Sequence, residues 1–231
     1  TLDQTTLTEM RANGLIIGGH DYTVTGVTVE TTGSVKYDFK AAKNEFTLDD
    51  AVTDGTWANR FMKSDLEKIT PYLLQLQQAG IPVLWRPLHE AAGKWFWWGN
   101  GSAASYVKLW HFMYDYFKAK GINNLIWVWT SEKADSDWYP GDDYVDIIGT
   151  DMYGQDGTAV SAAAMADRFN TLAYRYPTKM ISLTECGTVS DLPTQWNSDA
   201  KWSWSMPWYG STHATDDWWK AAMNSEYVIT R

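Results

Sequence analysis

The stretch IPVLWRPLHEAAGKWFWWG, residues 81–99, begins as a short apolar strand and ends in a cluster of four aromatic side chains. Between the two lie Arg86, His89 and Glu90. Charged groups at the end of a buried strand cost free energy unless they have a partner or a function. An aromatic surface next to a carboxyl group suggests that this function concerns a ring with apolar faces, such as a sugar.

A second stretch, KMISLTECG at residues 179–187, follows the same plan, because its apolar strand ends in Glu185. Two carboxyl groups at two strand ends are the minimum set for hydrolysing a glycosidic bond. Each glutamate also has a structural explanation, since Glu90 could pair with Arg86 and many strands end in glutamate. The aromatic cluster beside Glu90 and the recurrence of the same setting at Glu185 favour a catalytic pair.

Composition limits the kinds of partner that this chain can have. Its 231 residues suit one catalytic domain covering residues 1–231, and 45 % hydrophobic residues are enough for a core. The net charge of −9 comes without any basic cluster, which argues against nucleic acid or an anionic membrane as a partner. Fifteen tryptophans are more than packing alone requires, and flat aromatic rings make good platforms for sugars.

The single cysteine, Cys186, excludes an internal disulfide and says nothing about compartment. It adjoins Glu185 on an extended strand and so points the other way, as a small buried hydrophobic residue would. No run has the length of a membrane span, and no signal peptide precedes Thr1, which indicates a processed or trimmed chain. No spacing of His or Cys suggests zinc, and no calcium or phosphate loop is present, so no metal or cofactor is expected.

Apolar strands alternate with amphipathic helices, which indicates a parallel sheet covered by helices on both faces. The natural closure of such an α/β sheet is a TIM-type (β/α) barrel. Six strands are expected, at residues 15–19, 81–88, 124–129, 145–149, 180–183 and 202–207. Helices are expected at residues 5–13, 57–79, 103–120, 161–174 and 216–223. Because a complete barrel has eight strands, either two units before Thr1 are absent or segment 22–54, with a small hairpin around Gly33, replaces them.

Polar and aromatic side chains gather at the ends of these expected strands. In a (β/α) barrel the carboxyl ends of the strands form one rim, where active sites lie. The residues at or just beyond those ends are His20, Glu90, Ser131, Asp151, Glu185 and Trp208. A convergence of six is hard to explain by packing, so we expect a single site. Tyr153 follows Asp151 by two positions and points to the same side of the strand, which adds it to that site.

Four segments resemble glycoside hydrolase family 26, whose members are mostly endo-β-mannanases. RPLHEAAGKWFWWG resembles the acid/base motif of that family, and LTECG resembles its nucleophile segment. IGTDMYG resembles the strand whose tyrosine holds the nucleophile. GGHDY is similar to the segment of an active-site histidine, with Gly19 in place of the usual tryptophan. The resemblance covers essentially the whole chain and begins near the third strand of the family's barrel, which implies that about two strand–helix units are missing.

The resemblance implies a role for each matching residue. Glu90 would be the general acid/base and Glu185 the nucleophile, with His89 and Tyr153 hydrogen-bonded around them. The implied sugar contacts are His20, Trp95, Asp151 and Trp208, with Trp95 forming the +1 platform. Trp98 joins them because it lies in the aromatic run beside Glu90. Tyr209 stands where well-known members have an arginine that grips the distal sugar, so the match gives no guide to glycone specificity.

The expected chemistry is a double displacement that retains anomeric configuration. Glu90 must keep a proton near neutral pH, and Trp95 and Trp98 would exclude water from it. Glu185 must stay ionised, and hydrogen bonds from Tyr153 and Arg86 would stabilise its charge. A retaining pair requires carboxyl groups about 5–5.5 Å apart.

Three functions, two of them enzymatic and one not, remain open at the level of sequence. The leading one is a retaining endo-β-1,4-mannanase acting on mannan, glucomannan or galactomannan. The second is a β-glucanase or β-1,3-xylanase of the same family. The third is an inactive sugar-binding barrel fragment. Since a polysaccharide cannot enter a cell, the enzyme readings place the protein outside the cytoplasm, secreted or periplasmic.

Overall fold

The computed structural model describes residues 15–17, 20–25, 28–33, 46–209 and 213–229, and for the first three of these ranges the backbone alone. The chain divides into two compact units. Unit 1 takes residues 1–83, 90–125 and 134–140, and unit 2 takes residues 84–89, 126–133 and 141–231. The two units alternate along the sequence, and the expectation of one domain over residues 1–231 stays a prediction.

The main sheet has five strands in sequential order. They are β4 (Val83–Trp85), β5 (Leu125–Ser131), β6 (Ile147–Met152), β7 (Met180–Cys186) and β8 (Ser205–Pro207). The pairs β5–β6, β6–β7 and β7–β8 are parallel. Sequential parallel strands with helices between them are the arrangement of a (β/α) barrel. The predicted α/β fold of the TIM type is therefore confirmed, with five of the six expected strands in this sheet.

The sixth expected strand, at residues 15–19, was wrongly assigned to the barrel. Residues Leu15–Ile17 form β1 of a separate antiparallel sheet with β2 (His20–Thr25) and β3 (Thr28–Gly33). Two residues separate each strand from the next, which suits a hairpin, whereas a parallel neighbour needs a crossover of a dozen residues or more. The expected hairpin around Gly33 is wrong too, because β2 and β3 meet at Thr25 and Thr28. The helix predicted at residues 5–13 lies outside the described residues.

The helices of unit 1 are α2 (Leu48–Ala51), α3 (Trp57–Gln78) and α4 (Ala103–Ala119). Each begins after a Thr or Ser whose hydroxyl accepts a hydrogen bond from a backbone N–H of the first turn, which stabilises the helix start. The apolar face of α4 is buried and carries Tyr106, Leu109, Trp110, Met113 and Phe117. Helices α3 and α4 confirm the predicted helices at 57–79 and 103–120, whereas α2 is too short to show a sequence period.

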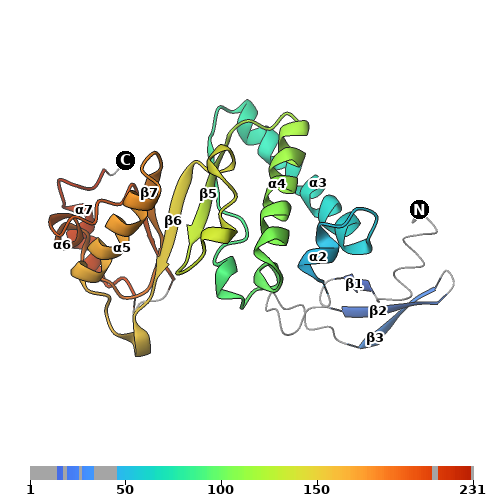
Figure 1. Ribbon diagram of the computed structural model, residues 1–231, viewed down its shortest axis with the longest axis horizontal. Coiled ribbons are helices and arrows are strands. Elements are labelled where there is room, and N and C mark those ends of the chain that lie inside the picture. The colour runs from blue at the N-terminus through green and yellow to red at the C-terminus, as the bar shows by residue number, and fades with distance from the viewer. Residues whose placement is uncertain (1–14, 18–19, 26–27, 34–45, 210–212, 230–231) are drawn as a thin grey trace. The chain divides into compact units, whose positions relative to one another are not determined.

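The helices of unit 2 are α5 (Ala162–Arg175), α6 (Leu192–Asn197) and α7 (Asp216–Met223). They build a core against β7, in which Met165 of α5 and Trp218 of α7 pack with Leu183 and Cys186. Figure 1 shows these helices gathered beside β7. The other face of β7 carries the polar side chains of Thr184 and Glu185, which are also buried. Short 3₁₀ turns lie at Ala91–Gly93, Trp97–Gly99, Ser136–Trp138, Asp142–Tyr144 and Gln155–Gly157. Nowhere in the described ranges does a helix have both the length and the apolar character of a bilayer span.

Candidate active site

A one-residue bulge in β7 determines where Glu185 points. Thr150 of β6 pairs with Leu183, but Asp151 pairs with Glu185, so Thr184 is an extra residue on β7. Leu183 and Cys186 both face the helices, although they are three positions apart and regular alternation would separate them. Such a bulge re-aims the side chains around it. It places Thr184 and Glu185 together on the opposite, polar side of the strand.

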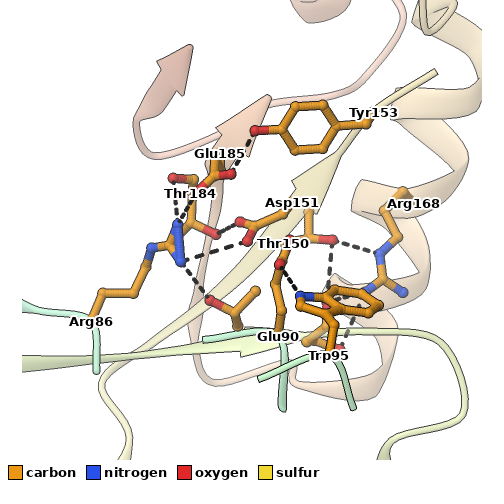
Figure 2. A network of polar contacts seen from close by, with 11 residues as sticks. Arg86, Glu90, Trp95, Thr150, Asp151, Tyr153, Arg168, Thr184 and Glu185 are labelled. Carbon is orange, nitrogen blue, oxygen red and sulfur yellow. Dashed lines mark hydrogen bonds and ion pairs between the residues drawn. The ribbon is translucent and has the colours of Figure 1, made fainter. Parts of the chain in front are cut away.

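The Glu185 carboxylate has a hydrogen-bond donor on each oxygen. The Tyr153 hydroxyl donates to Oε1 at 2.5 Å, and Arg86 Nη2 donates to Oε2 at 2.9 Å (Figure 2). The Glu185 side chain is only 9 % exposed. Charge-assisted hydrogen bonds of this kind stabilise a carboxylate where water is scarce. Tyr153 and Arg86 thus supply what a buried anion needs, as the sequence predicted.

Arg86, the residue directly after β4, is the centre of this polar network. Its Nη1 donates to the Thr130 hydroxyl at 3.3 Å, and its Nη2 also reaches the Thr184 carbonyl at 3.3 Å. Nη1 lies 3.5 Å from Asp151 Oδ2. One guanidinium therefore serves both Asp151 and Glu185 (Figure 2). These two carboxylates receive their counter-charge from the protein itself.

Asp151, a predicted substrate contact, is enclosed by protein. Its side chain is 1 % exposed. Oδ1 accepts a hydrogen bond from the Thr184 hydroxyl at 2.7 Å, and Oδ2 faces Arg86. A direct contact with substrate stays a prediction, because Thr184 and Arg86, which contact this carboxylate, are both protein groups of unit 2.

His89 is half-buried near the same guanidinium. Burial lowers the pKa of His89 to about 4, and the positive charge of Arg86 acts in the same direction. The ring is therefore neutral at neutral pH, with one nitrogen able to donate and the other to accept. This suits a group that orients a hydroxyl or a carboxyl, and its contact with substrate stays a prediction.

The pKa of His89 predicts how stability depends on pH. In the unfolded chain the ring titrates near its ordinary value of about 6.5. Between pH 6.5 and 4 the unfolded state therefore binds a proton that the folded state excludes, so this residue lowers stability as pH falls through that window. We expect the melting temperature of His89→Gln to fall less than that of the wild type between pH 6.5 and 4. From pH 7 to 8 the two slopes should coincide, and equal slopes in the acid window would contradict the assignment.

Cys186 is fully buried among the side chains that face the helices. Burial raises the pKa of its thiol to about 12, and the negative charges of Asp151 and Glu185 add to the effect. A thiol of this kind stays protonated and unreactive. The interpretation of Cys186 as a small buried hydrophobic residue is confirmed.

The loop that carries Glu90 has an unusual backbone. Leu88, Glu90 and Lys94 all have positive φ, at 51°, 53° and 64°. Each such residue costs about 1–3 kcal/mol and persists only where its surroundings enforce it, and such residues cluster at functional sites. Three within seven residues show that this loop is held in a specific shape, with Glu90 at its centre.

Trp95 is placed directly against Glu90 by this loop. Its Nε1 donates to Glu90 Oε2 at 3.0 Å (Figure 2). The Trp95 residue is 46 % exposed, so part of its ring is available for stacking. A Cβ at Gly93 would lie 2.0 Å from that ring, so the ring can take this position only with glycine there. The structure thus joins the predicted acid and the predicted sugar platform within unit 1.

Trp98 has a more structural setting than Trp95. Its ring stacks on Phe96 with centroids 4.4 Å apart and meets Trp97 edge-on. Trp97 in turn packs against Phe46. One face of the Trp98 ring is thus covered by a neighbour, and a sugar contact by this residue stays a prediction.

The remaining expected site residues fall in different places. His20 is the first residue of β2 in the antiparallel sheet and not the last residue of a main-sheet strand, and its side chain is not among those described. Trp208 follows β8, and its backbone N–H donates to the Cys186 carbonyl at 2.7 Å. It is 40 % exposed beside Tyr209, which is 80 % exposed. Trp208 therefore stands next to the strand end that carries Glu185, whereas contacts of His20 and Trp208 with sugar stay predictions.

Several residues of this region were missed by sequence reasoning. Arg168 of α5 donates from Nε to the Thr150 hydroxyl at 2.9 Å and from Nη2 to the Ser131 carbonyl at 2.7 Å (Figure 2). It thereby ties together the carboxyl ends of β5 and β6. Ser131, expected at the rim, is buried as part of this tie. Gly187 is needed because a Cβ there would meet the Tyr153 ring at 2.7 Å.

Taken by unit, the predicted site residues form two groups. Unit 2 brings together Arg86, His89, Asp151, Tyr153 and Glu185, and unit 1 brings together Glu90, Trp95 and the aromatic cluster. A sequential parallel (β/α) sheet with carboxylates and aromatic rings at its strand ends defines the class of the barrel glycoside hydrolases.

Comparison with known proteins narrows this class to one family. The sequence profile described as "Glycosyl hydrolase family 26" matches residues 20–231. The chain belongs to this family, which confirms the resemblance seen in the sequence.

Named relatives agree with this assignment. Mannan endo-1,4-beta-mannosidase A of Piromyces sp is 34 % identical over 191 residues, which are 82 % of this chain and 30 % of that protein. A mannan endo-1,4-beta-mannosidase of Thermothelomyces thermophilus is 39 % identical over 175 residues, covering 72 % of this chain and 34 % of its own length. The chain thus spans about a third of these relatives.

Solved structures share the fold. The GH26 domain of an endo-beta-mannanase/endo-beta-glucanase from Prevotella bryantii is 41 % identical, with a TM-score of 0.78 over 86 % of this chain and 65 % of that one. A beta-mannanase from a symbiotic protist of the termite Reticulitermes speratus, complexed with gluco-manno-oligosaccharide, is 39 % identical, with a TM-score of 0.75. It covers 86 % of this chain, which corresponds to 63 % of the protist chain.

Proposed function

We propose that this chain carries the catalytic residues of a retaining endo-β-1,4-mannanase acting on mannan, glucomannan or galactomannan. The observation that carries the proposal is the Glu185 carboxylate, buried at a strand end and held by Tyr153 and Arg86. The relatives at 34 % and 39 % identity are named mannan endo-1,4-beta-mannosidases, which favours a mannan substrate.

In this proposal Glu185 attacks the anomeric carbon and displaces the glycosidic oxygen, to which Glu90 gives its proton. The resulting glycosyl–enzyme ester is then hydrolysed by a water that returns a proton to Glu90. Two displacements at one carbon restore the original configuration. The proposal requires carboxyl groups about 5–5.5 Å apart when the enzyme acts.

The contacts of Glu90 suggest which of its oxygens carries the proton. An indole N–H can only donate, so the oxygen that faces Trp95 must accept. That oxygen is Oε2. The acid form of Glu90 would then hold its proton on Oε1, which leaves Oε1 to face the leaving group. Trp95 in this way orients the acid and also offers the exposed part of its ring to a sugar.

Gly93 tests this role of Trp95. In Gly93→Ala the new methyl would lie 2.0 Å from the indole ring, so the ring must move and release Glu90. As Glu90 gives up its proton it becomes a carboxylate, and losing a hydrogen bond to a charged group costs roughly 1.5–3 kcal/mol, so we expect kcat/KM to fall by about tenfold or more. Trp95→Phe should lose a comparable amount, because it also removes the donor.

The control for both variants is Lys94→Gln, which changes an exposed side chain in the same loop. It should keep wild-type activity. Full activity in Gly93→Ala, measured by release of reducing sugar, would contradict the role assigned to the Trp95–Glu90 contact.

The substrate is tested by product analysis on linear mannan, compared with Glu90→Gln. Released manno-oligosaccharides, with β-anomers appearing first in the NMR spectrum, would support a retaining endo-mannanase. A panel with mixed-linkage β-glucan and β-1,3-xylan separates the alternatives within the family, and preferred cleavage of either would replace mannan as the substrate. Binding of mannan without turnover would favour the inactive sugar-binding fragment.

A polymeric substrate also favours a place outside the cytoplasm. We therefore propose that the protein is secreted or periplasmic and that its partner is β-mannan rather than nucleic acid or membrane. Fractionation of the source cells, with detection by antibody, tests this placement. Recovery with the cytoplasmic fraction would contradict it.

A further inference from the structure

Arg86 forms ion pairs with two carboxylates at once, those of Asp151 and Glu185. Glu185 Oε2 lies 2.9 Å from its Nη2, and Asp151 Oδ2 lies 3.5 Å from its Nη1. The side chains are almost enclosed, with Arg86 13 % and Asp151 1 % exposed. Charges held so far from solvent are weakly screened, so each influences the other strongly. A group that binds Asp151 therefore also changes how strongly Arg86 stabilises the Glu185 carboxylate.

Among the described residues, Arg86 is the cation that pairs with Glu185. Tyr153 donates through its hydroxyl, and His213 lies edge-on to the Tyr153 ring at 6.2 Å between centroids. The His89 ring is neutral at neutral pH, and the Cys186 thiol keeps its proton. Asp151 and Glu185 thus compete for the charge of Arg86.

Thr184 modulates this competition from the bulge in β7. Its hydroxyl donates to Asp151 Oδ1 at 2.7 Å and so compensates part of the Asp151 charge. Because Leu183 faces the helices, its neighbour Thr184 points to the polar side, where its hydroxyl meets Asp151. The bulge keeps Glu185 on that same side, next to Thr184. Gly149 leaves room for it, since a Cβ at that position would lie 2.3 Å from the Thr184 methyl.

We propose that Asp151 and Thr184 are positioning residues that set how tightly Arg86 holds Glu185. Asp151 draws the guanidinium away from Glu185, and the Thr184 hydroxyl weakens that pull. The inference rests on the proposed function in one respect, which is that Glu185 is the nucleophile. It differs from the expectation that Asp151 binds the sugar, because here Asp151 acts through Arg86.

The test compares Asp151→Asn, Thr184→Val and the double variant. The acid limb of the pH profile of kcat/KM reports ionisation of the nucleophile in the free enzyme. Asp151→Asn removes a competing anion, so the limb should move to lower pH by about one unit. Thr184→Val leaves the Asp151 charge less compensated, so the limb should move to higher pH by roughly half a unit. The double variant should match Asp151→Asn, since Thr184 acts only through Asp151.

The matched control is Ser182→Ala, which removes another buried hydroxyl from β7 without touching the network. The acid limb of its kcat/KM profile should lie at the same pH as in the wild type. Thr184→Val preserves side-chain shape, so it remains informative if Asp151→Asn folds poorly. If Asp151→Asn raised KM but left the acid limb of the kcat/KM profile at its wild-type pH, the inference would be overturned in favour of a sugar contact. Lower melting temperatures with unmoved limbs would overturn it in favour of a purely structural role.

A second measurement separates this inference from the proposed function. Titration of the Glu185 carboxyl carbon by ¹³C NMR, assigned with Glu185→Gln, needs no turnover. The same opposite shifts in Asp151→Asn and Thr184→Val would support the inference even if the chain cleaved no polysaccharide. The inference alone would be overturned if the Glu185 titration did not move in Asp151→Asn and Thr184→Val while azide rescued Glu185→Ala. The assignment of Glu185 as the nucleophile would then still stand.

Discussion

Glu185→Ala is expected to lower kcat/KM on mannan by about 10⁴-fold or more, a loss typical of removing a nucleophile. The physical reason is that, in the proposed mechanism, Glu185 supplies the attacking oxygen, and alanine has none. Sodium azide should restore part of the activity, because the truncated side chain leaves space for a small anion beside Arg86. Azide would displace the leaving group once, so the product should be a glycosyl azide of inverted configuration. NMR of that product provides the measurement.

Tyr153→Phe is the control for this result. It removes the hydrogen bond to Glu185 Oε1 but keeps the nucleophile and the ring. We expect a loss of about ten- to a hundredfold, in line with roughly 1.5–3 kcal/mol for a hydrogen bond to a charged group, and no rescue by azide. If Glu185→Ala kept substantial activity, or gave no azide product in folded protein, Glu185 would not be the nucleophile.

Glu90→Ala is expected to show a different pattern. Loss of a general acid costs about 10²–10⁴-fold, and the cost depends on how much help the leaving group needs. Activity on mannan should therefore collapse, whereas formation of the glycosyl–enzyme from an aryl mannoside with an acidic phenol should persist. Azide should then react with that intermediate and give a product of retained configuration. Azide products of opposite configuration from Glu185→Ala and Glu90→Ala would identify Glu185 as the nucleophile and Glu90 as the acid, each from its own experiment.

Glu67→Gln is the matched control, because it alters a glutamate on the exposed side of α3 that binds Lys120. This variant should cleave mannan and the aryl mannoside at wild-type rates. An equal loss of mannan and aryl mannoside cleavage in Glu90→Ala would contradict the role of Glu90 as acid. An azide product of inverted configuration from this variant would exchange the two assignments.

Sequence reasoning succeeded where local rules decide the structure. Helix α7 occupies residues 216–223 as predicted, since Thr215 caps it and its apolar period is clear. It failed at residues 15–19, where an apolar run was assigned to the barrel although the neighbouring segments pair with it as hairpins. The short helices α2 and α6 were missed, because four and six residues are too few to show a period.

In the candidate site, too, sequence reasoning succeeded for some contacts and failed where strand geometry decides. Glu185 and Tyr153 were predicted correctly as neighbours, and their contact is confirmed. Strict alternation along β7 would have placed Leu183 and Glu185 on the same side, which is wrong because of the bulge at Thr184. The tie from Arg168 to Ser131 and Thr150 leaves no sequence signal, since an arginine on a helix is usually a surface residue.

The sequence by itself determined the fold class and the strands of the main sheet, because hydrophobic period and residue chemistry are local properties, whereas the catalytic roles of Glu90 and Glu185 stay predictions. Tertiary structure alone decided that one guanidinium serves two carboxylates. Arg86 meets Thr130 and Glu185 across 44 and 99 residues of chain. Contacts over such separations depend on strand register, and here a single extra residue in β7 changes that register and keeps Glu185 on the same side as Thr184, whose hydroxyl binds Asp151.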